Sequence, residues 1–504
     1  MGRDHTVTPT RRRFLSAGLV GLTAKGERRV AGGFVEDALM LGHRLRDRSA
    51  FGAPRQSRRI PLVIIGGGIA GLSAAWRLHK RGFRDFVLLE MRSQAGGNSR
   101  WGENEVSAFP WAAHYVPVPG KKATLARELF EDLGVLRDGQ WEERHLCHSP
   151  QERLFLHGRW QEGLLPETAA TSHDREQYRR FQSLMDEFRA AGEFAIPIES
   201  GARKMAGLDQ ISMMQWMRRQ EFDSPYLNWY VGYACRDDYG SLAASTSAWA
   251  GIHYFASRDQ DEHGPLTWAE GNGWIVRRLM ERLRPFVRTG AVVHRLLRQG
   301  RGWRVLTEEI EYSAECVIFA APTFLLPYLC EEPLPVREFV YSPWLTANLT
   351  LDRPPRERGV EPAWDNVIYG SRSLGYVVAT HQSLRTHIDR TVWTYYWALA
   401  DDPAEGRQLL LRRDWNGWKE AILADLERAH PDIRACVSRI DILRMGHAMI
   451  RPRPGFVFSE ERQRLARLTG TLLLANSDLS GLSLFEEAQY RGVMAAERAL
   501  RPAG

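Results

Sequence analysis

Two short apolar runs near the start of the chain follow the pattern of buried strands. Residues 62–65 and 86–89 are apolar without interruption, which is typical of parallel strands covered on both faces. Between them, Ile69, Leu72 and Trp76 recur at three- and four-residue spacing, the period of an amphipathic helix. The pattern therefore predicts a strand, a helix and a second parallel strand, in that order.

Farther along the chain, the hydrophobic period changes twice. Residues 121–267 carry apolar positions at helical spacing, for example Tyr178, Phe181 and Leu184. Residues 331–440 begin with alternating, strand-like runs and end in a helical pattern. The expected strands lie at 345–351, 375–379 and 392–398, and the expected helix at about 415–430.

A glycine cluster separates the first predicted strand from the helix that follows it. Gly66, Gly68 and Gly71 form a Gly-x-Gly-x-x-Gly motif, and Glu90 ends the second strand nineteen residues later. In this context Gly66 allows the tight turn, Gly68 lets the backbone approach a pyrophosphate, and Gly71 lets the helix pack close to the strand. The helix N-terminus attracts the phosphates, and the Glu90 carboxylate can accept hydrogen bonds from a ribose. An ordinary glycine-rich turn is the alternative, but strand, helix and acid together predict a dinucleotide site.

The segment after Glu90 narrows the choice of dinucleotide. Gly96 and Gly97 follow the acid by six residues, and this arrangement resembles flavoproteins of the amine oxidase, protoporphyrinogen oxidase and phytoene desaturase group. In that group the glycine pair passes under the flavin diphosphate, so the resemblance favours FAD over NAD. The flanking arginines of the group are displaced here to Arg92 and Arg100.

Three later segments resemble the same group in the same order. Residues 268–279 are similar to its glycine-led helix, and residues 290–322 to the strands that follow it, where the position of Val293 meets the adenine. Residues 470–492 are similar to its last flavin motif, in which an acid at the position of Asp478 lies beside the ribityl-phosphate, although Asn476 and Glu487 depart from the usual residues. The residues implied to bind FAD are Gly66, Gly68, Ile69, Ala70, Gly71, Glu90, Met91, Gly96, Gly97, Asn98, Val293 and Asp478.

The resemblance also implies the architecture. We expect an α/β fold with a discontinuous FAD/NAD(P)-binding Rossmann-like domain and an inserted α+β substrate domain. A chain of 504 residues is long enough for two domains. The expected boundaries are 1–58 for a signal and basic linker, 59–120, 268–330 and 441–504 for the FAD domain, and 121–267 and 331–440 for the substrate domain.

The net charge of +7 comes from the N-terminal segment. The first 59 residues hold 13 of the 68 Lys and Arg but only 5 of the 61 Asp and Glu, so the remainder is nearly neutral. This distribution gives no support to nucleic-acid binding. Five scattered cysteines without Cys-x-x-Cys spacing predict no metal site.

The basic segment begins with a sequence that resembles a twin-arginine export signal. Arg11 and Arg12 precede Phe14-Leu15 and a mild apolar run to Ala24, which is too short to span a membrane. That route exports folded proteins, so we expect the protein to bind FAD before export. The twin-arginine export machinery is the expected partner, and the enzyme is expected to be periplasmic or exported. A basic tail on a cytoplasmic protein is the alternative, and residues 25–59 are interpreted as a flexible lead into the first strand.

The resemblance implies hydride transfer from a small-molecule substrate to flavin N5, with amine oxidation as the leading reaction. His114 lies where the chain of that group passes the flavin, but a hydrogen-bonded structural histidine is the alternative. Tyr395 shares a strand face with Trp393 and Trp397 that would suit an amine, but packing in the core of the sheet is the alternative. His114 and Tyr395 are therefore weak catalytic candidates. None of the six lysines lies in the strand where many amine oxidases hold a water with one. Oxygen and a quinone therefore both remain as acceptors.

Two other functions stay open at this point. An isoprenoid- or porphyrinogen-type desaturase or oxidase would use the same fold on an apolar hydride donor. A flavin-fold binding module without turnover would explain the departures at Gln94, Asn98 and Glu487.

Overall fold

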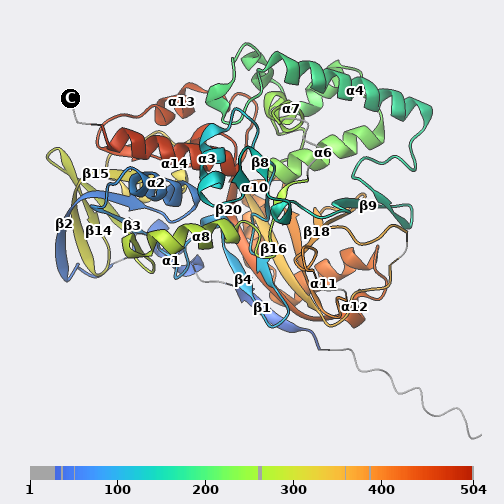
Figure 1. The fold of residues 1–504 in the computed structure, drawn as a ribbon, viewed down its shortest axis with the longest axis horizontal. Coiled ribbons are helices and arrows are strands. Elements are labelled where there is room, and N and C mark those ends of the chain that lie inside the picture. Colours follow the sequence, from blue (N-terminus) through green and yellow to red (C-terminus); the bar gives the residue numbers. More distant parts are fainter. Residues whose placement is uncertain are drawn as a thin grey trace, which may run out of the picture.

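The computed structural model describes residues 29–35, 38–49, 51–258, 264–357, 359–384 and 387–501. Two sheets organise the protein (Figure 1). The predicted export signal at residues 10–24 lies outside the described residues. Among those residues, no helix is both long and apolar enough to cross a membrane.

The first sheet contains the predicted strand–helix–strand unit. Its order is β12-β3-β2-β15-β14-β13, and β21 pairs with β15; the β12, β3, β2, β15 and β21 pairings are parallel. Val63 and Ile64 in β2 are fully buried, as an uninterrupted apolar run predicts. The helices α2, α8 and α14 share a hydrophobic core on one face of this sheet (Figure 1). The bounds are β2 Gln56–Ile65, α2 Ile69–Lys80, β3 Phe86–Leu89, α8 Gly273–Leu283, β12 Val287–Arg288, β13 Arg295–Gln299, β14 Gly302–Leu306, β15 Ile310–Phe319, β21 Leu472–Leu474 and α14 Phe485–Ala499.

The second sheet has eight strands in the order β1-β20-β16-β19-β18-β17-β9-β10. The three strands expected at 345–351, 375–379 and 392–398 are confirmed as β16, β18 and β19, which pair antiparallel. One face of the sheet packs against α10, α11 and α12, which include the helix expected near residue 415. The bounds are β9 Glu152–Leu156, β10 Arg159–Glu162, β16 Tyr341–Leu351, β17 Asp365–Ile368, β18 Gly375–Val378, β19 Thr391–Ala398, α10 Pro403–Arg412, α11 Trp415–Glu427, α12 Ile433–Cys436 and β20 Val437–Ile450.

A layer of helices lies beside the second sheet and has its own core. Thr171 caps α4 with a reciprocal capping box, and α6 ends at Gly240 in the left-handed conformation. The region 121–267 is less helical than expected, because β9 and β10 form a hairpin around Gly158 that joins the second sheet. The remaining helices are α3 Thr124–Asp132, α4 Ser172–Ala191, α5 Met213–Arg219, α6 Pro225–Tyr239, α7 Ala248–Ala256, α9 Leu326–Leu329 and α13 Glu460–Ala466. The small strand pairs are β4 Trp101–Glu103 with β5 Ala108–Pro110, β6 Tyr115–Val116 with β11 Leu266–Thr267, and β7 Leu136–Arg137 with β8 Gln140–Trp141.

Two expected boundaries differ from the structure. The lead at 25–59 is folded in part, with β1 at Ala31–Val35 and α1 at Leu39–Arg46. β1 contains two glycines and carries little strand signal, so its pairing with β20 decides its conformation. β20 also runs to Ile450, so the second sheet includes residues 441–450 that we expected in the FAD domain.

Candidate functional site

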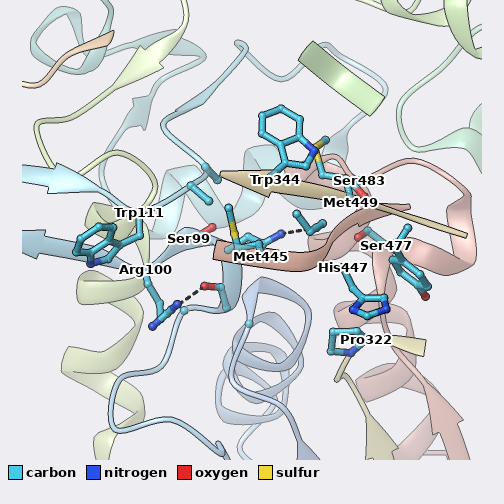
Figure 2. Close-up of a pocket in the computed structure, with 18 of the residues that line it drawn as sticks. Ser99, Arg100, Trp111, Pro322, Trp344, Met445, His447, Met449, Ser477 and Ser483 are labelled. Carbon is cyan, nitrogen blue, oxygen red and sulfur yellow. Dashed lines mark hydrogen bonds between the residues drawn. The ribbon is translucent and has the colours of Figure 1, made fainter. Parts of the chain in front are cut away.

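One cavity of about 930 Å³ is lined by residues of both sheets. Arg100 and Trp111 lie on one side of it, and Pro322, His447 and Ser477 on the other (Figure 2). The first sheet contributes the ends of its parallel strands, where α/β proteins bind their ligands. Residues of β16–β20 line the cavity from the second sheet.

The glycine turn has the geometry that its sequence predicts. Gly66 has φ 103°, and a Cβ there would lie 2.7 Å from the Ala321 nitrogen. A Cβ on Gly71 would lie 1.9 Å from the Gly66 oxygen, so only glycine allows α2 to pack this close. A Cβ on Gly68 would meet nothing nearer than Gly97 Cα at 3.9 Å, because this residue faces the open cavity. The open space next to Gly68 thus lies where the pyrophosphate of a dinucleotide would pass.

Glu90 is 5% exposed and is held by the turn itself. Its Oε2 accepts a hydrogen bond from Gly67 N at 2.7 Å, and its Oε1 accepts one from Arg92 N at 2.8 Å. A carboxylate has about four acceptor positions, so two remain for other donors. Because Glu90 lines the cavity beside Met91 and Val293, the pocket end is suited to a ribose and its base.

The second glycine pair forms a loop against the first. Gly96 and Gly97 have φ values of 131° and 57°, and Gly96 N donates to Gly67 O at 2.7 Å. Asn98 Nδ2 donates to the Ala448 carbonyl of β20 at 2.8 Å, which ties the loop to the second sheet. Arg100 folds back, and its Nε lies 3.2 Å from Gly97 O (Figure 2). The displaced arginine therefore still brings a cation to the loop.

At the opposite wall, Asp478 lines the cavity and is buried. Its Oδ2 accepts hydrogen bonds from Thr323 N at 2.9 Å and Tyr341 Oη at 2.7 Å, while burial raises its pKa. Glu487 does not line the cavity; it accepts from Ile198 N and Ser480 Oγ, both at 2.6 Å. The departure at Glu487 is therefore part of a buried structural network.

Of the twelve residues implied to bind a cofactor, the structure brings eleven to this cavity. Gly71 is the exception, because it lies behind the turn and contacts the Gly66 carbonyl. Four buried polar atoms of cavity-lining residues have no hydrogen-bond partner among the described residues: Asn272 Oδ1, Trp344 Nε1, Thr346 Oγ1 and Glu486 Oε2. Atoms of this kind are normally satisfied, so a polar ligand fits here.

His114 lies in the second half of the cavity. Its ring stacks on Tyr396 with centroids 4.5 Å apart, and its Nδ1 lies 3.3 Å from the Ala112 carbonyl that it can donate to. Burial lowers the pKa of His114 to about 4, so the ring is neutral at physiological pH. With Nδ1 as the donor, Nε2 is an acceptor. Trp364, which does not line the cavity, packs against the same ring with centroids 5.5 Å apart.

The structure corrects the expectation for Tyr395. Strand pairing places Thr346 opposite Tyr396, and Ala347 opposite Tyr395, so the two tyrosines lie on opposite faces of the sheet. Tyr396 faces the cavity, whereas Tyr395 packs in the core under α11 and donates to Asp425 Oδ2 at 3.0 Å. Tyr395 is therefore a structural residue, and Tyr396 takes the place beside His114.

Sequence reasoning missed the carboxyl groups of the cavity. Asp237 and Asp238 lie in the last turn of α6, and Asp365 begins β17. Burial raises the pKa of Asp237 to about 6, that of Asp238 to about 7, and that of Asp365 well above its usual value. Arg258 lies near Asp238 and opposes the rise of its pKa, and Arg258 Nη1 donates to Glu486 Oε1 at 2.7 Å. The one signal in the sequence was an acidic pair inside an aromatic helix.

These groups make the second half of the cavity an acidic chamber with aromatic walls. The Tyr115 hydroxyl lies 3.5 Å from Asp237 Oδ2, and its ring packs 5.6 Å from Trp364. No lysine among the described residues lines the cavity. The same part of the chain contains no group of three or more His, Cys, Asp or Glu that could hold a metal ion. The carboxyls of this chamber can thus bind a cation that donates hydrogen bonds.

Comparisons with known proteins agree with this geometry. A family described as NAD(P)-binding Rossmann-like domain matches residues 64–133. The Baeyer-Villiger monooxygenase peniC of Penicillium patulum is 30% identical over 111 residues, which are 22% of this chain and only 16% of that relative.

Solved structures are similar over most of the chain. Putrescine oxidase bound to putrescine has a TM-score of 0.66 at 18% identity, covering 88% of this chain and 99% of that one. Cyclohexylamine oxidase from Brevibacterium oxydans IH-35A has a TM-score of 0.65 at 14% identity, covering 87% and 98%. A fatty acid isomerase from P. acnes has a TM-score of 0.60 at 12% identity, covering 88% and 99%. These likenesses confirm the predicted α/β fold with a Rossmann-like domain.

Proposed function

We propose that the protein is an FAD-dependent oxidoreductase that oxidises amines. The cofactor assignment rests on the continuous cradle formed by the Gly68 turn, the Glu90 carboxylate, the Gly97 loop and Asp478, all on one cavity. Bound FAD would accept a hydride from the carbon next to the substrate nitrogen, which leaves an imine that water hydrolyses. Amine oxidases are among the structures that share this fold.

The acidic chamber is the observation that carries the amine assignment. Asp237, Asp238 and Asp365 all line this chamber, and Arg258, the cation that acts on Asp238, is already paired with Glu486. Buried carboxylates are unfavourable unless they are neutralised by a proton or a cation. A substrate ammonium group would donate hydrogen bonds to them, and the aromatic walls would pack against its carbon chain. A fully apolar hydride donor would supply no hydrogen bond to these carboxyls.

The chamber also offers a group for the proton that an ammonium must lose before it can give up hydride. The pKa of Asp238, raised to about 7 by burial, suits a base that works near neutral pH. His114 is neutral and stacks on Tyr396, so its role is to orient the substrate and to exclude water. The Tyr396 hydroxyl is engaged with Ala112 O at 2.9 Å, which fixes this wall.

Anaerobic titration of the purified protein tests the proposal. Flavin absorbance should bleach when a diamine, an aromatic amine or a cyclic amine is added without oxygen. Asp237→Asn should slow bleaching at low amine concentration more than at saturation, because the group binds the ammonium. Bleaching by a carotenoid or porphyrinogen precursor alone would favour a desaturase, and a flavin that no substrate reduces would favour a binding module.

The electron acceptor and the cellular compartment of the enzyme belong to the same proposal. Oxygen activation needs a positive or hydrogen-bonded site near the reduced flavin, and no described lysine supplies one in this cavity. A quinone or a similar carrier is therefore proposed as the acceptor. The twin-arginine signal proposed at residues 10–24 would take the folded, FAD-loaded enzyme out of the cytoplasm.

A further inference from the structure

One short N-terminal segment touches both sheets. β1 pairs in parallel with β20, in register from Ala31 opposite Arg439 to Val35 opposite Leu443. α1 then lies against the first sheet, where Leu45 is 4% exposed and packs in the same core as Val293. Residues 31–35 and 38–46 are called the strap here. β1 belongs to the second sheet and α1 packs on the core of the first (Figure 1), and residues of both line the cavity.

The strap lines the end of the cavity that is suited to the adenosine. It borders the same space as Glu90 and Val293, the two residues placed at that end. The strap residues that line the cavity are Val35, Ala38, Leu39, Gly42, His43, Leu45 and Arg46.

Contacts on the outer side hold α1 in this position. Arg44 Nη2 lies 2.7 Å from Glu308 Oε1, and its guanidinium stacks 4.3 Å from the Phe51 ring. Phe51 in turn stacks on His294, the residue after Val293, with centroids 4.6 Å apart. Through Phe51, α1 is thus attached to the segment that would meet the adenine.

We propose that the strap is part of the cofactor site, closing its adenosine half and slowing release of the dinucleotide. The proposal rests on the proposed function for the identity of that dinucleotide, FAD. The adenosine half cannot open widely while β1 stays paired with β20 and Leu45 stays buried. Release then requires the strap to detach, and a bound ligand leaves no faster than its cover opens.

Two neighbouring glycines allow a matched test. Gly32 has φ 128°, and a Cβ there would lie 1.9 Å from the Ile440 carbonyl oxygen of β20. A Cβ on Gly33 would meet nothing within 4 Å. Gly32→Ala should therefore detach β1, whereas Gly33→Ala leaves it in place. Leu45→Ala weakens the other end of the strap, with the 66% exposed Met40→Ala as its control.

The measurement is the rate at which FAD leaves the holoenzyme, followed by flavin fluorescence after dilution into a large volume of flavin-free buffer. Gly32→Ala and Leu45→Ala should each release FAD about ten-fold faster or more, with faster trypsin cleavage at Arg44–Arg48. Gly33→Ala and Met40→Ala should match the wild type in both readouts. If Gly32→Ala does not fold, Leu45→Ala decides.

Two outcomes would overturn the proposal in different ways. Faster trypsin cleavage with unchanged FAD release would show that the strap detaches without controlling the cofactor. A wild-type protein that binds no FAD, whether purified or reconstituted, would overturn the proposed function and this proposal with it.

Discussion

Replacing Asp237 with Asn should strengthen the fold and weaken the function. Burial raises the pKa of this carboxyl from 3.8 to about 6. The folded protein therefore holds a proton there that the unfolded chain has already lost, and stability falls as pH rises from about 4 to 6. A shift of about two units corresponds to about 3 kcal/mol, and the partial solvent exposure of Asp237 reduces this to about 1–3 kcal/mol. Asn keeps the shape and removes the charge.

The assay compares unfolding of the substrate-free protein at two pH values. Asp237→Asn should be more stable than the wild type by about 1–3 kcal/mol at pH ~8, and this gain should shrink by more than half at pH ~4.5. Binding of an unreactive primary ammonium compound that has no hydrogen on the carbon next to its nitrogen, followed by the flavin spectrum, should become about 5- to 100-fold weaker at pH ~8. In the wild type this affinity should rise between pH ~5 and ~8, as Asp237 and Asp238 ionise.

The opposite signs of the two effects separate this prediction from simple damage to the fold. A residue that only supports the structure would lower stability and binding together when replaced. Asp85→Asn, at an exposed aspartate far from the cavity lining, should change neither quantity. The reasoning is refuted if Asp237→Asn is less stable than the wild type at the higher pH, or binds the ammonium compound equally well.

Three further predictions concern the cofactor, the signal and the acceptor. Gly68→Val should fold normally, because its Cβ would meet only Gly97 Cα at 3.9 Å, but it should carry no flavin. Glu90→Ala should weaken FAD binding by about 1–3 kcal/mol. Full flavin content in Gly68→Val would contradict the assignment of the cofactor site. Replacing Arg11 and Arg12 with Lys should leave folded, flavin-loaded protein in the cytoplasm, and fractionation showing an unchanged distribution would mean that the tail has another role. Photoreduced enzyme mixed with air-saturated buffer in a stopped-flow instrument should reoxidise more slowly than with a soluble quinone, and rapid reoxidation by air would identify oxygen as the acceptor.

Local sequence patterns were sufficient for the parts of the site that one segment builds. The close contact of Gly71 with Gly66 O lies within a single turn, and the structure places Gly66, Gly68 and Gly71 at that turn as the motif predicts. The atoms nearest Gly66 and Gly68 belong to Ala321 and Gly97 of other segments. Three strands of the second sheet, β16, β18 and β19, were also visible, because alternation is a property of neighbouring residues. Alternation does not tell which face of a strand meets a cavity. The pairing of β16 with β19 decided between Tyr395 and Tyr396.

The acidic chamber and the strap depend on contacts between distant segments. Asp237 ends a helix and Asp365 begins a strand, so only the fold brings the two carboxyls to one space. In the same way, the Ala-Gly-Gly-Phe-Val sequence of β1 has weak strand propensity and becomes a strand because β20 offers it a free edge. The sequence carried both features, but no local rule could identify them.

The pairing of β1 with β20 also orders events in time. The two strands are about 400 residues apart in the chain, so the ribosome makes β20 long after β1 has emerged. At about 5–20 residues per second, roughly 20–80 s pass before the partner edge exists. Throughout this interval β1 has no partner strand, and Asp478 of the proposed cofactor site is made only after β20. Docking of β1 is thus a late step of folding, and only after it can the proposed strap close over the dinucleotide.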